Sequence, residues 1–165
     1  MKPNLKNIKG LTYPMDDKAI PQMEYIHQFL HHLPYYALLL DSNRKIVASN
    51  KTVLNDNALN DVRELFDKGP GDIFQCENAE EAGCGNSPNC KFCGIYKTLA
   101  ECHERDALIT NSCKIMVKRD SFIKAFEFMV RCSPIIFPGA KFFLMTLTDV
   151  SSDSRKRSLE RIFFS

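Results

Sequence analysis

The sequence lacks the segments that mark membrane and secreted proteins. No apolar run approaches the roughly 18 residues that cross a bilayer. The first ten residues, MKPNLKNIKG, contain no apolar core of the kind found in signal peptides. We therefore expect a cytosolic protein without a membrane span. In that reducing compartment, clustered cysteines are typical of metal ligands or redox thiols rather than of structural disulfides.

The sequence also has little net charge and no recognisable catalytic motif. The formal net charge is only +2, and segment 153–165, with four basic and two acidic side chains, accounts for all of it. No Gly-rich phosphate loop, Ser–His–Asp order or pair of catalytic carboxylates can be picked out. With 165 residues the chain has the length of one domain with short flanking helices. We expect neither an enzyme nor a nucleic-acid partner.

The N-terminal third begins with an arm and an amphipathic helix. Residues 1–15 show no periodicity and contain two prolines, which predicts a flexible arm. Segment 16–33 is predicted to be a helix, with one apolar stripe formed by Met23, Ile26, Leu30 and Leu33. Such a stripe fits either a partner helix or the sheet of the same domain.

The remaining elements predict an α+β fold. Segments 35–40 and 45–48 read as a hairpin, and 51–68 as two short helices. After a helix over 95–108, three strands follow around 113–117, 126–132 and 143–147, and 151–165 begins an exit helix. We expect one five-stranded antiparallel sheet over 34–150, with helices on one side and amphipathic helices at both ends.

Residues 69–94 form an insert of unusual composition. They contain five of the seven glycines and four of the seven cysteines in the chain. Such a segment has too few apolar residues to build a core of its own. Because binding a metal through its cysteines would supply the missing order, the insert is predicted to be functional.

The four cysteines of the insert, Cys76, Cys84, Cys90 and Cys93, follow the pattern C-x7-C-x5-C-x2-C. Four soft thiolates suit either an iron–sulfur cluster or a tetrahedral zinc ion. Zinc sites usually contain two short C-x2-C knuckles, whereas the first pair here is seven residues apart, which favours iron. Zinc and metal-free thiols stay open as alternatives.

The other metal-binding residue types fit structural roles. Cys113 and Cys132 fall on the apolar phase of predicted strands, as small core residues do, and Cys102 is expected to be a partly buried thiol. His27 and His31 have the spacing of a metal pair on a helix, but no carboxylate or third ligand accompanies them. We expect both histidines on a polar helix face.

Three stretches give the chain a resemblance to a known family. HHLPYYALLLDSNRKIVASNKTVL resembles the first hairpin of a PAS domain with Asn50 opening the next helix, and LMTLTDVSSDSRKR resembles its closing strand with Thr148 and Asp149. PGDIFQCENAEEAGCGNSPNCKFCG is similar to a cysteine-bearing insert of PAS sensor domains in bacterial histidine kinases. The resemblance covers about residues 22–165.

The resemblance implies a sensory role. It implies a homodimer formed through the terminal helices, and a metal site whose state alters the packing of the insert and so the exit helix. SLERIFFS is similar to the linker that leads into the phosphoacceptor helix of such kinases, but Ser165 stands where the kinases have histidine. Any kinase activity would then belong to a longer parent protein with a downstream kinase or output domain, or the chain would be a stand-alone relative of these sensors. The alternative is a dimerisation module with a structural zinc site and no redox sensing.

Overall fold

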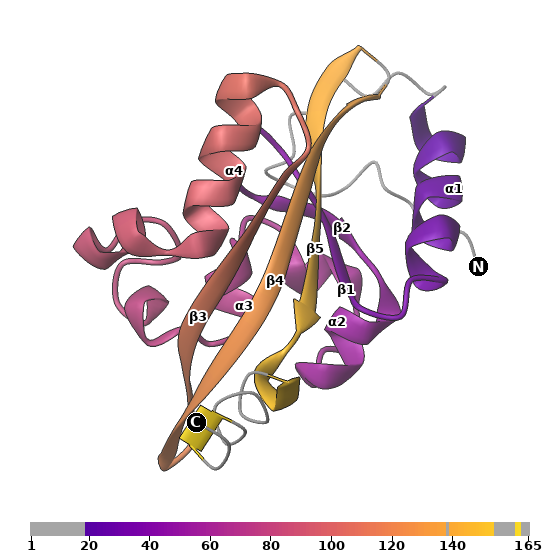
Figure 1. Ribbon diagram of the computed structural model, residues 1–165. Helices are drawn as coiled ribbons and strands as arrows, with labels where there is room; N and C mark the ends of the chain where they lie inside the picture. The colour runs from indigo at the N-terminus through magenta and orange to yellow at the C-terminus, as the bar shows by residue number, and fades with distance from the viewer. Residues whose placement is uncertain (1–18, 138, 154–160, 163–165) are drawn as a thin grey trace.

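The computed structural model describes residues 19–137, 139–153 and 161–162. A twisted five-stranded antiparallel sheet crosses the described part of the chain, in the order β2-β1-β5-β4-β3 (Figure 1). Its strands are β1 (Tyr36–Leu40), β2 (Ile46–Ser49), β3 (Ile109–Arg119), β4 (Phe122–Phe137) and β5 (Ala140–Asp149). The predicted α+β fold with one antiparallel sheet is confirmed. The predicted arm and most of the predicted exit helix lie outside the described residues.

One face of the sheet carries the larger core. Because side chains alternate along a strand, every second residue of β3, β4 and β5 points to this face. The helices α2 (Lys51–Asp56), α3 (Pro70–Ile73) and α4 (Gly94–Arg105) cover it. The buried sheet residues there include Leu38, Leu40, Cys113, Ile115, Phe128, Val130, Cys132, Phe143, Met145 and Leu147. Burying one such Leu or Phe side chain stabilises the fold by about 1.5–3 kcal/mol.

The first helix, α1 (Ala19–His31), lies on the opposite face of the sheet, apart from the other helices (Figure 1). Leu30 is only 4% exposed and packs with Leu39 and Phe142 in a second, smaller core. Ile26 and Leu33 are partly buried against the same core. The described side chains of the predicted stripe, Ile26, Leu30 and Leu33, therefore contact the sheet of their own domain, which is one of the two partners that the sequence allowed.

Asn50 ties the end of α1 to the hairpin and to α2. Its side-chain Nδ2 donates to the carbonyl oxygens of Tyr35 at 2.7 Å and Leu33 at 3.3 Å. Its Oδ1 accepts from the backbone N–H of Ala37 at 3.3 Å and, as the N-cap of α2, from that of Val53 at 3.4 Å. Since Asn50 is 0% exposed, these bonds satisfy a polar side chain that water does not reach.

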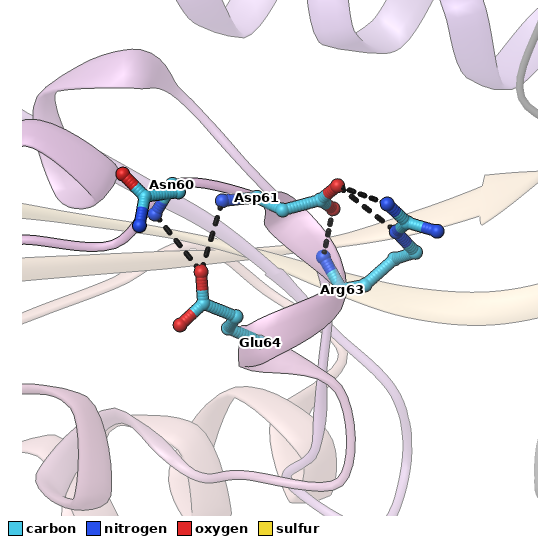
Figure 2. Close-up of polar contacts among 4 residues, drawn as sticks. All are labelled: Asn60, Asp61, Arg63 and Glu64. Carbon is cyan, nitrogen blue, oxygen red and sulfur yellow. Dashed lines mark hydrogen bonds and ion pairs between the residues drawn. The ribbon is translucent and has the colours of Figure 1, made fainter.

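Segment 51–68 forms two short helices, as expected: α2 and the 3-10 turn η2 (Val62–Leu65). Figure 2 shows the reciprocal caps that start η2. An Asp61 side-chain oxygen accepts from the Arg63 N–H at 2.8 Å, and Glu64 Oε1 accepts from the backbone N–H groups of Asn60 and Asp61 at 2.9 and 3.1 Å. This capping box fixes the loop and directs Leu65 into the core, where it is 0% exposed.

The helix predicted over 95–108 is shorter at its C-terminus. The helix α4 ends at Arg105, because Asp106 adopts the left-handed conformation with φ at 51°. Leu108 is consequently 51% exposed instead of packing on a helix face, and β3 begins at Ile109. Among the described residues, no helix is both long enough and apolar enough to cross a membrane.

Candidate metal centre

The cysteine-rich insert lies along the edge strand β3. The backbone N–H of Lys118 donates to the Gln75 carbonyl at 3.0 Å, and Cys76 forms an isolated antiparallel bridge with Val117. The Lys118 ammonium also pairs with Glu80 at 2.9 Å. The insert itself contains only α3 and two short 3-10 turns, η3 (Glu77–Ala79) and η4 (Pro88–Phe92). It therefore shields a strand edge that would otherwise leave backbone groups unpaired.

The structure brings all four predicted cysteines to one cavity of about 270 Å³. Two elements supply residues of its apolar wall, with Ile95 and Leu99 from α4 and Ile115 from β3. The cysteines reach it from different parts of the insert: Cys76 before η3, Cys84 in the loop after it, Cys90 within η4, and Cys93 at the start of α4. The grouping predicted from the sequence is thus present as a shared cavity lining.

Cys84 is held by the start of the insert. Its Sγ accepts from the backbone N–H of Gly71 at 3.2 Å, and its own N–H donates to Asp72 Oδ1 at 2.8 Å. A Cβ atom added at Gly69 would lie 2.7 Å from Cys84 Cβ, and one added at Gly71 would lie 3.0 Å from Cys84 Sγ. Two glycines are therefore required for the close approach that places this sulfur.

Cys76 and Cys93 stand at the starts of helical segments. Cys76 is the N-cap of η3 and Cys93 is the N-cap of α4, and neither side chain forms a cap hydrogen bond. The nearby backbone of Asn78 acts to lower the pKa of Cys76, and that of Tyr96 and Ile95 acts to lower the pKa of Cys93. Backbone amides near a sulfur favour its thiolate form, which is the form that binds metal.

The protein environment shifts the thiol pKa values in opposite directions. Burial raises the pKa of Cys76, and it raises that of Cys84 to about 11 although the Gly71 amide partly opposes it. The pKa of Cys93 is lowered to about 6, first by the hydrogen bond with Cys113 and then by the Tyr96 and Ile95 amides. Burial opposes ionisation of Cys76 and Cys84, so a bound cation would be needed to keep these two sulfurs ionised beside Cys93.

The donors fit a sulfur-bound centre by two criteria. All four side chains are soft thiols, and Gly69 and Gly71 leave room for the Cys84 side chain, which a Cβ atom at either position would crowd. Within the described ranges, however, no three His, Cys, Asp or Glu side chains are grouped closely enough to hold a single ion. The cysteines line the cavity and do not converge on one point.

The three remaining cysteines are all buried. Cys132 lies in the core as predicted, at 0% exposed. Cys102 is also 0% exposed, not partly buried as expected, because α4 packs it against β4 beside Cys132. Cys113 occupies the core as predicted, but its Sγ also lies 3.9 Å from Cys93 Sγ. The sequence could not reveal that pair, since the two residues belong to different elements.

Arg44 is a second residue of the site that sequence reasoning missed. It belongs to the β1–β2 turn, far from the insert in sequence, yet it lines the same cavity. Its guanidinium lies 4.9 Å from the centre of the Tyr96 ring, in cation–π contact. A Cβ added at Gly85 would approach that guanidinium to 3.0 Å, so this glycine leaves the space that Arg44 occupies.

The histidines lie apart from the cysteines. His31 Nδ1 accepts from the backbone N–H of Lys51 at 3.1 Å, and His27 donates to the Ser49 carbonyl. Burial is the main cause that lowers the pKa of both. These contacts join α1 to the end of β2 and to α2, which agrees with a structural role.

Comparisons with known proteins concern the fold. No protein-family model matches the chain, and no curated protein matches it significantly. Among solved structures, the chain is similar to a Rhodobacter sphaeroides LOV protein (14% identity, TM-score 0.54, covering 82% of this chain and 69% of that one). It is also similar to the PAS domain of nitrogen regulation protein NR(II) from Vibrio parahaemolyticus (13% identity, TM-score 0.52, covering 75% and 96%).

A third similar structure is an RNA-binding Light-Oxygen-Voltage receptor, with 12% identity and a TM-score of 0.55. That alignment covers 92% of this chain but only 38% of the receptor. At such low sequence identity, the structural similarity establishes a shared architecture alone. The strand order and the helix placement described above agree with that architecture. This chain therefore has the fold of PAS and Light-Oxygen-Voltage domains.

Proposed function

We propose that this chain is a sensory PAS domain in which Cys76, Cys84, Cys90 and Cys93 bind an iron–sulfur cluster that responds to oxygen or redox poise. The observation that carries the proposal is that all four cysteines line one cavity beside the edge strand of the sheet. Nothing in their sequence spacing requires this arrangement. The amide that Gly71 donates to the Cys84 sulfur further supports a centre held by thiolates.

The cavity favours a cluster over a single ion. It has a volume of about 270 Å³, and its cysteines line it without converging on one point. A cluster would occupy the space between thiols that a lone zinc ion would leave unfilled. When bound, the cluster would supply a one-electron couple. Arg44 would place a positive charge near the thiolates, and the apolar wall would limit access of water.

We propose that β3 and β4 carry a change in the insert to the exit segment. The insert is fixed to β3 by the bridge between Cys76 and Val117. The neighbouring strand β4 holds the exit segment, because Glu127 N–H donates to Ser151 Oγ at 2.9 Å and the Glu127 carbonyl accepts from Val150 at 2.8 Å. Movement of the insert would then bias the segment that begins at Ser151 between two arrangements. A downstream histidine kinase is the output we propose, on the basis of the C-terminal resemblance.

A second candidate function is a dimerisation module whose cysteines hold a structural zinc ion. Its dimer interface would include Tyr25 and Phe29 on α1, which are 62% and 76% exposed although both are large and aromatic. Both candidates include a homodimer through the terminal helices. They differ in that the second requires no response to oxygen.

Two cysteine variants and one exposure experiment separate these candidates. Cys90→Ser should lose bound iron and sulfide, whereas Cys132→Ser, also buried but remote from the cavity, should keep them. Air exposure of the wild-type protein should change amide hydrogen exchange around Ser151, and Cys90→Ser should show no such response. Equal exchange in anaerobic and air-exposed wild-type protein would contradict sensing, and zinc retained in both conditions would favour the second candidate.

A further inference from the structure

We propose that Cys93 and Cys113 form a peroxide-sensitive dithiol that closes to an intramolecular disulfide. Their Sγ atoms lie 3.9 Å apart. The pair shares Cys93 with the proposed metal centre, so the disulfide forms in protein whose Cys93 is not bound to metal. Cys113 is not among the four predicted ligands, and the chemistry itself needs no metal.

The pair is created by a close backbone contact. Gly94 lies directly against β3: a Cβ atom at that position would be 2.3 Å from the Ser112 carbonyl oxygen and 2.8 Å from Cys113 Cα. Only glycine allows the chain to approach the strand so closely. The consequence is that the residue before Gly94 places its sulfur beside Cys113, although the two cysteines come from α4 and β3.

The pair lies at the N-terminus of α4. Cys93 is the N-cap residue of this helix, and Gly94, its first residue, lies against Cys113. This helix has 12 residues, so its N-terminus carries a substantial partial positive charge. The thiolate is the form of cysteine that attacks an oxidant, and the partial positive charge at a helix N-terminus favours that form.

The two thiols differ in access, which assigns their roles. Cys93 is partly exposed and lines the cavity, whereas Cys113 is 2% exposed and is not part of the lining. A molecule as small as hydrogen peroxide fits a cavity of about 270 Å³. Cys93 is therefore the attacking thiol, and Cys113 behind it is the resolving thiol.

The reaction has two balanced steps. The Cys93 thiolate attacks one oxygen of hydrogen peroxide, so that an S–O bond forms, the O–O bond breaks and hydroxide leaves to take up a proton as water. Cys113 then attacks the Cys93 sulfur, an S–S bond forms, and the S–O bond breaks to release a second water that carries the Cys113 proton. Two thiols lose two electrons and peroxide gains them. The sulfurs must approach by about 2 Å to reach an S–S length of about 2.05 Å.

Peptide mapping tests the proposal directly, because cleavage after lysine and arginine separates the two cysteines from all others. Peptide 92–97 contains only Cys93, and peptide 106–114 contains only Cys113. The full chain is treated with one equivalent of hydrogen peroxide, remaining thiols are alkylated, and the digest is analysed by mass spectrometry without reduction. We expect these two peptides linked, with the loss of two hydrogen atoms, and separated again by a thiol reductant.

Variants and metal analysis complete the experiment. Cys113→Ser should abolish the link and leave a Cys93 sulfenic acid that dimedone traps, while Cys132→Ser should form the link as wild type does. A link from peptide 92–97 to peptide 69–91, or oxidation of Cys93 without any link in the wild-type protein, would overturn the proposal. Iron and zinc are measured in the same samples. A protein that forms the link but binds no metal would refute the metal centre alone, and a protein that binds metal but forms no link, even after chelation, would refute the dithiol alone.

Discussion

Replacing Asn50 with alanine tests how the first helix is fastened to the hairpin. The substitution removes four hydrogen bonds, of which the donation to the Tyr35 carbonyl at 2.7 Å is short and the other three are between 3.3 and 3.4 Å. A buried hydrogen bond contributes about 0.5–1.5 kcal/mol net. With one strong and three weak bonds at a site that is 0% exposed, Asn50→Ala should lower the free energy of unfolding by about 2–4 kcal/mol.

Asn50→Asp separates the two halves of this network. Aspartate keeps the oxygen that accepts from Val53 and is as good an N-cap as asparagine. At neutral pH it has no N–H to donate to Tyr35 or Leu33, and it buries a charge facing their carbonyl oxygens. The structure therefore predicts a loss at least as large as that of Asn50→Ala.

Urea unfolding followed by far-ultraviolet circular dichroism measures these differences, since the chain has no tryptophan. Asn43→Ala serves as the matched control. Asn43 is exposed in the β1–β2 turn, only its backbone N–H is bonded, and its replacement should change stability by less than about 0.5 kcal/mol. The reasoning would be refuted by an Asn50→Asp protein as stable as wild type, because capping of α2 would then account for the whole effect.

Two further predictions concern packing and pH. Gly94→Ala should lower the free energy of unfolding, measured in urea, by about 1–2 kcal/mol. Crowding against Ser112 costs about 1–3 kcal/mol, whereas the greater helix propensity of alanine offsets at most about 1 kcal/mol of that cost. An unchanged unfolding midpoint would show that the backbone moves apart without a measurable cost. Burial and the hydrogen bond to Asp56 raise the pKa of Tyr36 well above 10, so wild-type stability should fall as the pH rises above 10, where only the unfolded tyrosine ionises. Tyr36→Phe should fall less steeply over that pH range, and parallel curves would contradict the prediction.

The sheet could be predicted from the sequence because its signals are local. Alternating apolar residues on β3, β4 and β5 face one core, and the turn at 41–45 lies between two short apolar runs. The sequence predicts that this helix continues to residue 108, whereas α4 ends at Arg105. Hydrophobic periodicity does not detect the left-handed conformation of one residue, Asp106, that ends the helix. The stripe on α1 predicted a buried face but left its partner open, and only the tertiary structure places Leu30 on Leu39 and Phe142.

The site could be predicted only in part, for a physical reason. The spacing of four cysteines within the insert predicts a metal site, because they stand close together in the sequence: Cys76, Cys84, Cys90 and Cys93. Arg44 in the β1–β2 turn lines the same cavity, and Cys113 on β3 contacts Cys93. Both residues are distant from the insert in sequence, so their positions depend on tertiary contacts that cysteine spacing does not predict. The approach of Gly94 to β3 is one such contact, and a glycine in sequence gives no hint of what it touches.

The most direct test of the central claim is the metal content of the full chain purified without oxygen. Elemental analysis for iron, zinc and acid-labile sulfide is combined with an ultraviolet–visible spectrum. The account predicts a brown protein with charge-transfer absorbance, iron and sulfide that fall together in Cys90→Ser, and bleaching of the colour in air. Stoichiometric zinc without iron or sulfide in the anaerobic protein would contradict it.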